Sequence, residues 1–478
     1  MKTVLFTLNA GHAHAALAVR VLRDALLGAG LEAEVIEATE RERTHNVLAR
    51  LVRADAALYG FSCYIWNIDA MLALAADLKR LRPACRIVLG GPEVSFAPER
   101  FTALDFVDCV VSGEGEQAVV ELAQRVGQGK ALPPLWTGAS DDSFLQAGVH
   151  YSPEEERAAK LVYYESSRGC PFSCAFCLSS VSDGVRAKSA AQTLAELAEF
   201  EKIEAPLTVK LVDRTFNFDR ARAKQIWQGL LSPAYTKCYH FEVAAHLLDD
   251  ESFAILAQFP KGKVRLEIGL QSTNEKTLAA VARHADAGAV LEAARRLCAP
   301  GNLHVHLDLI AGLPHEDYAS FARSFDDAYF ACDVLQLGFL KLLHGTALRR
   351  DAEALGIRFS AKSPYTVLET RDISFFELEK LRVIAELLER LRDAGRFVHT
   401  LWLLLPAFFT PFAFYEGFAD FLARVTDKPL QKIAQRDLFT LLSRFARENI
   451  PAESHARLSE ALRADFASCE VRRAPHDL

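Results

Sequence analysis

The sequence predicts an α/β protein that combines a doubly wound parallel-sheet domain, a partial (β/α)6 barrel and a mostly helical carboxy-terminal domain. Three observations lead to this fold class. The chain has 478 residues, enough for about three domains of about 150 residues each. Up to about residue 350, short apolar runs alternate with helical patterns, as they do in parallel sheets that helices cover. Beyond about residue 355 the helical period dominates.

Residues 1–135 are expected to form the doubly wound domain. Helical stretches at 15–27 and 68–81 lie between its predicted strands, which are the apolar runs 4–8, 33–36, 56–61, 87–89 and 107–111. Glycines fall at or just after the ends of the last three runs: Gly60, Gly90, Gly91, Gly113 and Gly115. Doubly wound domains bind ligands at this edge of the sheet, where glycine lets a backbone come close to the ligand. Polar, proline-bearing sequence predicts a linker over 136–158.

Residues 159–350 are expected to form the partial barrel. Its six predicted strands are the apolar runs 161–166, 208–212, 239–244, 264–270, 303–310 and 334–341, and the chemistry of such barrels lies on the loops after the strands. Residues 351–478 are expected to form a helical cap, with helices at 375–391 and 430–447. The aromatic side chains between residues 408 and 418 either line an apolar pocket or pack into a core.

The composition argues against several classes of protein. Acidic residues outnumber basic ones by 62 to 55, which does not suit a basic nucleic-acid groove. Ten cysteines are too few for a disulfide-built secreted fold, and no signal-peptide core is apparent. The longest uncharged stretch, 397–415, contains Pro406 and Pro411, so we do not expect a membrane span. The expected compartment is the cytoplasm, where clustered cysteines indicate metal or redox chemistry.

Three of the cysteines lie together after the first expected barrel strand. Cys170, Cys174 and Cys177 are spaced so that one loop can wrap three thiolates around a metal group. A structural zinc site needs a fourth cysteine or histidine, and none is near in sequence. Thiolates also bind iron–sulfur clusters, and three of them on a four-iron cluster leave one iron open to a small molecule. Cys63 is the one scattered cysteine whose loop is expected at a ligand.

The C-x3-C-x2-C spacing, with Phe176 before the last cysteine, resembles the radical S-adenosylmethionine (SAM) superfamily over about residues 160–345. The resemblance implies that the three cysteines hold a 4Fe-4S cluster and that SAM binds its fourth iron. It assigns further SAM contacts to Phe176, Glu242, Gln271, Arg283, Asp308 and Gly312. A guanidinium at position 283 can grip the SAM carboxylate through a charge-assisted fork. The second strand departs from the family's glycine-rich pattern and reads Asp213-Arg214-Thr215-Phe216-Asn217, a run that occurs in the cobalamin-associated branch.

The five units of the first domain, joined to this TIM-like barrel, resemble the Rossmann-like cobalamin-binding domain of cobalamin-dependent radical SAM enzymes. Three loops match in order, those after the third, fourth and fifth strands. The resemblance assigns cobalamin contacts to Ser62, Tyr64, Trp66, Gly90, Gly91, Pro92, Gly113 and Glu114. Small residues suit such a site because the nucleotide tail of cobalamin passes between the sheet and the helices. A flavodoxin-like or other Rossmann-type ligand site is the alternative.

The first loop lacks the Asp-x-His-x-x-Gly motif of domains that ligate cobalt through histidine. It reads Asn9-Ala10-Gly11-His12-Ala13-His14-Ala15-Ala16, and imidazole ligands usually need an orienting partner. We expect neither His12 nor His14 to ligate cobalt, so that cobalamin binds base-off without a histidine ligand. Tyr64 or Trp66 could then cover the vacant lower face.

The resemblance implies methylation of an unactivated carbon of a small molecule, through a 5′-deoxyadenosyl radical and methylcobalamin, with a flavodoxin- or ferredoxin-type electron donor. The alternatives are an oxidative cyclase or ring-rearranging enzyme with the same cofactors, a cobalamin-binding sensor or carrier, and a tRNA-modifying enzyme. The last would need the basic surface that the acidic composition does not offer. No catalytic residue is identified; Lys341 and His344, after the sixth barrel strand, are candidates for substrate contact or proton transfer. The carboxy-terminal region resembles an uncharacterised region that accompanies a subgroup of these enzymes, and it does not name a substrate.

Overall fold

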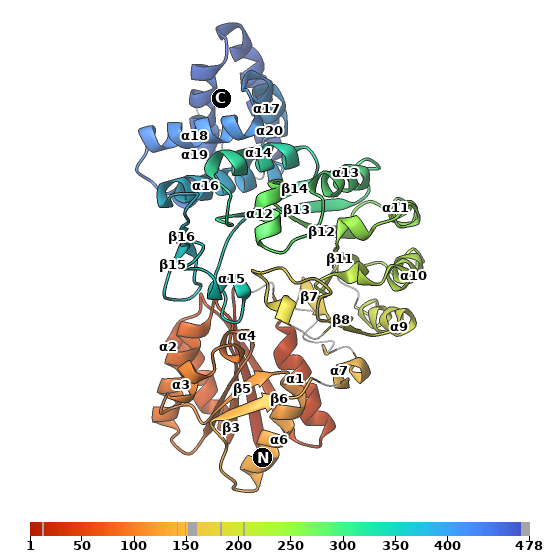
Figure 1. The fold of residues 1–478 in the computed structure, drawn as a ribbon, viewed down its shortest axis with the longest axis vertical. Coiled ribbons are helices and arrows are strands. Elements are labelled where there is room, and N and C mark those ends of the chain that lie inside the picture. The colour runs from red at the N-terminus through yellow and green to blue at the C-terminus, as the bar shows by residue number, and fades with distance from the viewer. Residues whose placement is uncertain are drawn as a thin grey trace. The chain divides into compact units, whose positions relative to one another are not determined.

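The computed structural model describes residues 1–11, 14–140, 142–148, 150–151, 160–181, 184–203 and 206–469 (Figure 1). It divides into two compact units, between which the chain passes more than once. The first unit comprises Met1–Glu242, Lys341–Asp351 and Ser360–Thr366, and the second comprises Val243–Leu340, Ala352–Phe359 and Val367–Leu478. The division therefore passes through the region expected to be the barrel, while the predicted domain boundaries themselves stay a prediction.

The first unit begins with a six-stranded parallel sheet of order β2-β1-β3-β4-β5-β6. Its strands are β1 (Lys2–Asn9), β2 (Glu32–Thr39), β3 (Leu58–Ser62), β4 (Arg86–Gly90), β5 (Cys109–Gly113) and β6 (Leu135–Gly138). The five predicted strands are all present, which confirms the doubly wound fold. The sixth strand, β6, was not predicted and falls at the start of the stretch expected to be a linker. Four residues after two prolines carry too little strand signal to be recognised.

Helices cover both faces of this sheet: α1 (Leu17–Gly28), α2 (Thr44–Ala54), α3 (Ile68–Leu81), α4 (Pro92–Ser95), α5 (Glu99–Thr102) and α6 (Glu116–Gly127). Figure 1 shows α2 and α3 on one side and α1 and α6 on the other. The alternation of side chains along β1 accounts for the two layers. Val4 and Phe6 join the core beneath α2 and α3, and Leu5 between them joins the core beneath α1 and α6.

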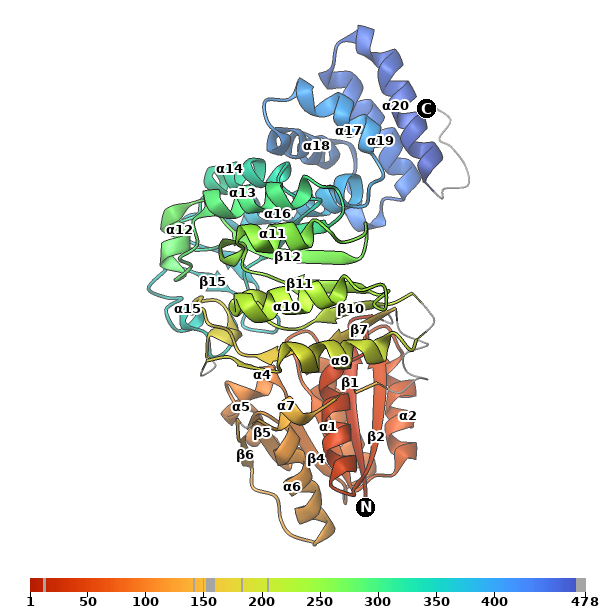
Figure 2. The same ribbon diagram turned by 90° about the vertical axis from the view of Figure 1, so that its right-hand side faces the viewer.

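The rest of the first unit contains three parallel strands with their helices. The strands are β7 (Leu161–Tyr164), β10 (Thr208–Leu211) and β11 (Cys238–Glu242), with β10 paired to both others. Helices α9 (Ala190–Phe200) and α10 (Arg220–Leu230) lie side by side on them (Figure 2). Two residues each from β8 (Ser167–Arg168) and β9 (Arg186–Ala187) form an antiparallel ribbon. The short helices α7 (Ser143–Gln146) and α15 (Ala347–Arg350) complete this unit.

The second unit contains three more parallel strands, β12 (Val264–Gln271), β13 (His304–Ala311) and β14 (Val334–Phe339). Its helices here are α11 (Asp250–Leu256), α12 (Glu275–Ala280), α13 (Ala287–Cys298) and α14 (Tyr318–Tyr329). A small antiparallel pair, β15 (Arg358–Phe359) and β16 (Val367–Glu369), follows. With β7, β10 and β11, these strands account for all six apolar runs that predicted the barrel.

The carboxy-terminal part of the second unit is helical, as predicted. It consists of α16 (Phe375–Leu388), a π-helical turn (Glu389–Asp393), α17 (Val398–Leu404), α18 (Pro411–Val425), α19 (Gln435–Asn449) and α20 (His455–Ser468), with α17–α20 gathered together in Figure 2. A capping box of Ser374 and Glu377 begins α16. Phe414 and Phe418 of α18 pack against Phe445 of α19, with ring centroids 6.0 and 5.1 Å away. Phe414 and Phe418 are fully buried and build a core, whereas Phe409, in the same aromatic stretch, is 99% exposed.

No single helix in the described parts of the chain is both long and apolar enough to span a bilayer. The segments Val398–Ala407 and Pro411–Val425 meet that test only when taken together, and they are bent by 101° at the break between them.

Candidate functional site

A pocket of about 720 Å³ lies at the carboxyl ends of the strands of the first sheet. All eight residues predicted to contact cobalamin line it: Ser62, Tyr64, Trp66, Gly90, Gly91, Pro92, Gly113 and Glu114. Three loops that are far apart in sequence thus meet at one site, because the carboxyl ends of parallel strands share one edge of the sheet. Their role as cofactor contacts remains a prediction.

Two of the glycines are required by the backbone of the pocket. Gly91 has φ +105° and Gly113 has φ +94°, a region that L side chains rarely adopt. A Cβ on Gly91 would lie 2.5 Å from the carbonyl oxygen of Cys63, and one on Gly113 would lie 2.8 Å from that of Gly138. At both positions the backbone at the edge of the pocket packs so closely on neighbouring backbone that only glycine fits without a shift.

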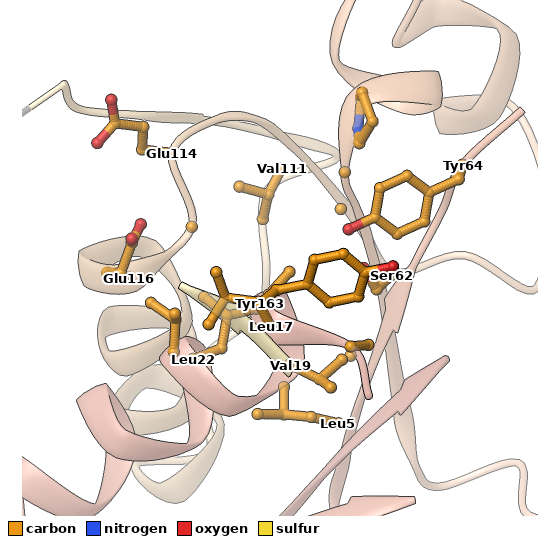
Figure 3. Close-up of a pocket in the computed structure, with 18 of the residues that line it drawn as sticks. Leu5, Leu17, Val19, Leu22, Ser62, Tyr64, Val111, Glu114, Glu116 and Tyr163 are labelled. Carbon is orange, nitrogen blue, oxygen red and sulfur yellow. The ribbon is translucent and has the colours of Figure 1, made fainter. Parts of the chain in front are cut away.

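The walls of the pocket differ in chemistry (Figure 3). Leu5, Leu17, Val19 and Leu22 form an aliphatic base, Glu114 and Glu116 lie on one side, and Ser62 and Tyr64 lie on the other. The ring of Tyr64 stacks on that of Trp66 with centroids 4.4 Å apart. Burial raises the pKa of Tyr64, so its hydroxyl stays protonated. Both aromatic side chains expected to face the corrin thus belong to the pocket.

Asn67 holds this aromatic pair in place. Its side-chain oxygen accepts the Tyr64 backbone N–H at 2.8 Å, and its amide nitrogen donates to the carbonyls of Leu8 and Ser62 at 3.2 Å. Cys63, on the same loop, is fully buried in the core and does not line the pocket. Its thiol therefore packs in the interior, away from the ligand edge.

His14 also lines the pocket. Its Nδ1 lies 2.7 Å from the hydroxyl of Tyr163, and Asn9 Nδ2 donates to its backbone carbonyl at 3.1 Å. His12, the other histidine of the first loop, lies outside the described residues. The prediction that neither histidine ligates cobalt is left as it stands.

A second polar wall comes from strands that the sequence assigned to the barrel. Tyr163, Glu165, Lys210, Arg214 and Glu242 all line the same pocket, and Lys210 Nζ lies 3.9 Å from a Glu242 carboxylate oxygen. Only Glu242 was expected to bind a cofactor, and the expected ligand was SAM. Tyr163 and Lys210 occupy the half-buried positions that alternate with buried ones along β7 and β10, so they share one face of these paired strands.

The cysteine loop follows β8 directly. Gly169 turns the chain with φ +94°, Cys174 is buried, and Cys170 and Cys177 are partly exposed. The Cys177 N–H donates to the Cys174 carbonyl at 3.0 Å, and the Leu348 N–H of α15 donates to that of Ala175 at 2.9 Å. Among the described residues no three His, Cys, Asp or Glu side chains converge on a single ion. Thiolates are the ligands of iron–sulfur clusters, and all three cysteines of the motif lie on this one loop.

The unusual second strand supports the cysteine loop. Asp213 is fully buried and accepts hydrogen bonds from the hydroxyls of Ser166 and Ser167, the former at 2.8 Å. The Thr215 hydroxyl lies 3.4 Å from Cys170 Sγ. The run 213–217 therefore anchors the chain on both sides of β8.

Three of the predicted SAM residues come together in the second unit, around Gly269 of β12. Arg283 donates to the Gly269 carbonyl, a Cβ on Gly269 would meet the Gln271 amide, and Asp308 of β13 pairs in register with Gly269. The Gln271 side-chain oxygen is buried without a hydrogen-bond partner among the described residues. Such an orphaned acceptor suits a polar ligand, which supports the expectation that SAM binds here.

Gly312 follows β13 with φ +89°, and Phe176 lies within the cysteine loop of the first unit. Both residues keep their predicted SAM role.

Lys341 and His344 belong to the first unit, and neither lines the pocket. His344 Nε2 lies 2.7 Å from Arg100 Nη1. Burial, together with Arg349 and Arg100, lowers the pKa of His344 to about 4. The imidazole is thus neutral at pH 7 with one nitrogen engaged by a cation. This geometry favours a structural role for His344 over proton transfer.

Comparison with protein families divides the chain in the same order. Residues 3–123 match the B12 binding domain, residues 164–328 match the radical SAM superfamily, and residues 353–477 match a protein family of unknown function, DUF4080. The chain combines a B12-binding domain with a radical SAM domain. The predicted resemblance to cobalamin-dependent radical SAM enzymes is thereby confirmed, as are cobalamin, a 4Fe-4S cluster and SAM as cofactors.

Two curated relatives and one solved structure illustrate the similarity. The chain is 26% identical to 2-(S-pantetheinyl)-carbapenam-3-carboxylate methyltransferase of Streptantibioticus cattleyicolor, over 56% of this chain and 44% of that protein. It is also 26% identical to the cobalamin-dependent radical SAM methyltransferase TokK of Streptomyces tokunonensis, over 56% of this chain and 43% of that protein. The chain spans less than half the length of these relatives.

The solved structure is that of the radical SAM methyltransferase TsrM from Kitasatospora setae, with cobalamin and a [4Fe-4S] cluster bound. It superposes with a TM-score of 0.64 at 17% identity, and the match covers 98% of this chain and 99% of that one. This likeness confirms the fold class: a Rossmann-like domain, a radical SAM domain and a helical carboxy-terminal region.

Proposed function

We propose that this radical SAM protein methylates an unactivated carbon of a small molecule, with cobalamin in the pocket of the first unit and a 4Fe-4S cluster on the cysteine loop. One observation carries the proposal: the pocket and the cysteine loop belong to one compact unit, and Arg168, two residues before Cys170, lines the pocket. When bound, the cluster and SAM supply a 5′-deoxyadenosyl radical, and cobalamin supplies the methyl group.

The residues of the chain would hold and shield these groups. The close backbone approaches at Gly91 and Gly113 leave space for the corrin between the loops. The aliphatic base and the Tyr64–Trp66 stack would enclose the cofactor, which we expect to be base-off without a histidine ligand. In the second unit, Arg283 and the orphaned Gln271 oxygen would bind the polar ends of SAM.

A small-molecule substrate fits the activity named for the carbapenam relative, and we extend it to this chain as part of the proposal. An electron donor of the flavodoxin or ferredoxin type would reduce the cluster. Lys210, Arg214 and Glu242 on the second polar wall are charged groups at the pocket that a polar substrate could contact.

The test uses the full chain reconstituted with iron, sulfide and hydroxocobalamin, then supplied with SAM and a low-potential reductant. We expect S-adenosylhomocysteine, which reports methyl transfer to cobalamin, and 5′-deoxyadenosine, which reports reductive cleavage of SAM. Cys174→Ala should lose the cluster and 5′-deoxyadenosine formation while it still binds cobalamin. Cys469→Ala, at a partly exposed thiol of the helical region, is the matched control and should keep both products.

Each contrary outcome replaces the proposal with a defined alternative. If 5′-deoxyadenosine forms without S-adenosylhomocysteine, methyl transfer is wrong and a cyclase or ring-rearranging enzyme takes its place. If cobalamin binds but SAM is never cleaved, the protein is a cobalamin sensor or carrier.

A further inference from the structure

Arg168 is surrounded by carboxylates from the loop after β5 and from the end of β7. Its Nη1 donates to Glu114 at 2.8 Å, and its Nε donates to both oxygens of Glu165 at 3.0 Å. Its Nη2 donates to Glu116 and again to Glu165. Only 17% of the Arg168 side chain is exposed. One guanidinium therefore links the chain just before Cys170 to the loop after β5.

A second guanidinium strengthens the same link. Arg186 of β9 stands directly opposite Arg168 of β8, where two like charges repel each other. Arg186 also donates to Glu114, and the ring of Phe144 lies 4.6 and 5.2 Å from the two guanidinium carbons. The carboxylate of Glu114 is therefore shared between two cations, so its position governs both.

The position of Glu114 is itself imposed by the sheet. A Cβ on Gly138 of β6 would lie 1.8 Å from the Glu114 carbonyl oxygen, so the loop after β5 is pressed against β6. The Ser140 hydroxyl donates to a Glu114 carboxylate oxygen at 3.2 Å. Arg168 is thus held by a loop that the Rossmann-like domain fixes.

The same residues line the pocket assigned to cobalamin: Glu114, Glu116, Glu165 and Arg168. A ligand that orders the loop after β5 would order the carboxylates that grip Arg168, and through it the start of the cysteine loop. Lysine could not make this set of contacts, because only the planar guanidinium offers a rigid fork of five donors.

We propose that Arg168 is a positioning residue that couples the two cofactor sites, so that cobalamin in the pocket and a cluster on the cysteine loop each strengthen binding of the other. The inference rests on the cofactor placement proposed above. Coupling of this kind is reciprocal by thermodynamic necessity and commonly amounts to about 5–150-fold.

The test measures the dissociation constant of hydroxocobalamin for the full chain with and without prior reconstitution of the cluster. The ratio of the two constants is the coupling factor, which we expect to be about fivefold or more in the wild-type protein. Arg168→Gln should bring the ratio to within about twofold of one, and Arg168→Lys should give an intermediate value. Arg86→Gln, which removes an ion pair to Asp108 away from the pocket, should leave the ratio unchanged.

The reciprocal measurement is the iron content after reconstitution with limiting iron, with and without hydroxocobalamin. Cobalamin should raise it in the wild-type protein and not in Arg168→Gln. Glu116→Gln should lower the coupling factor. Combining it with Arg168→Gln should lower the factor no further than Arg168→Gln alone, because both substitutions break the same connection. If Arg168→Gln does not fold or takes up no cluster, Arg168→Lys and Glu116→Gln carry the same comparison.

Two results would overturn the coupling while leaving the cofactor assignment intact. One is a wild-type coupling factor of one, and the other is an unchanged factor in the Arg168 and Glu116 variants. A wild-type protein that binds no cobalamin or takes up no iron would instead overturn the proposed function itself.

Discussion

Glu316 shows how strongly burial acts on a single side chain in this protein. It follows the turn after β13 and is 1% exposed. One carboxylate oxygen accepts from the hydroxyls of Ser272 and Ser324, at 2.6 and 3.3 Å, and the other has no partner among the described residues. Burial raises the pKa of Glu316 to about 7, so the native state holds a proton that the unfolded chain releases near pH 4.5.

This raised pKa predicts a specific loss of stability with rising pH. A carboxyl group whose pKa is raised in the native state contributes its full stabilisation below its unfolded-state pKa. This stabilisation is lost as the pH rises through the folded-state pKa. Glu316→Gln cannot ionise, so the free energy of unfolding of the wild type relative to this variant should fall by roughly 2–3 kcal/mol between pH 5 and pH 8. Urea unfolding at several pH values measures it. Glu292→Gln, at a carboxylate 76% exposed, should run parallel to the wild type, and parallel curves for Glu316→Gln would contradict the prediction.

At the scale of the element, the loops after β3, β4 and β5 owe their shape to glycine and to one another. Gly91 lies against the backbone of Cys63, and Gly113 lies against Gly138. Each of these two glycines thus fixes its loop against neighbouring backbone at the edge of the one pocket that the three loops share.

Gly91→Ala should therefore weaken cobalamin binding by about tenfold or more, a change of about 1.4 kcal/mol, because the loop must move away from Cys63. The matched control is Gly129→Ala. Gly129 also has a positive φ, +69°, but no atom lies within 4 Å of the place that a Cβ would take there. Both variants should lose about 1 kcal/mol of unfolding free energy from backbone strain. Equal cobalamin affinity in the two variants would show that close approach at Gly91 does not shape the pocket.

The elements with strong apolar runs could be predicted from the sequence, and the contacts between them could not. The strands β1 and β12 and the helix α3 lie within one or two residues of their predicted bounds. The repeat of apolar side chains within each of these elements is enough to predict it. β6 escaped prediction, since four residues carry too short a pattern. The Arg168 ion pairs join residues 52 and 54 positions apart, and no local pattern reports such a distance.

The site residues divide in the same way, into those that a sequence pattern marks and those that only the packing of the chain reveals. The eight pocket residues sit on loops whose glycines mark them in the sequence. Tyr163 and Lys210 carry no motif, and the packing that brings their strands to the pocket is what identifies them. His344 appeared as a candidate by its place after a strand, and only its 2.7 Å contact with Arg100 reveals a competing role.

On the scale of the whole molecule, the helical region has an interior of its own. Phe445 is 2% exposed and contacts four aromatic rings of this region, those of Phe408, Phe414, Phe418 and Phe421. Tyr329 of α14 extends the contacts toward the strands of the second unit, with its ring centroid 5.9 Å from that of Tyr415. The DUF4080 match thus corresponds to a packed structure rather than to a tail.

Phe445→Ala should cost about 3–5 kcal/mol of unfolding free energy, as buried phenylalanine truncations do. Phe409→Ala, at a ring 99% exposed, should change it by less than about 0.5 kcal/mol. Urea unfolding of the full chain, followed by circular dichroism, compares the two variants. A small loss for Phe445→Ala would mean that the aromatic cluster does not stabilise this region.

The chain returns to the first unit twice, at Lys341–Asp351 and at Ser360–Thr366. These returns affect when the first unit can be completed during synthesis. Ser363 donates to the carbonyl of Ile65, and Tyr365 donates to Glu93, a carboxylate 2% exposed. A ribosome that has finished the first 242 residues has therefore supplied Arg100, one partner of Glu93, but not yet the Tyr365 hydroxyl. The unit assigned to both metal cofactors closes only after residue 366 emerges. Fragments cut at residue 350 should thus leave Glu93 with Arg100 as a partner but without Tyr365.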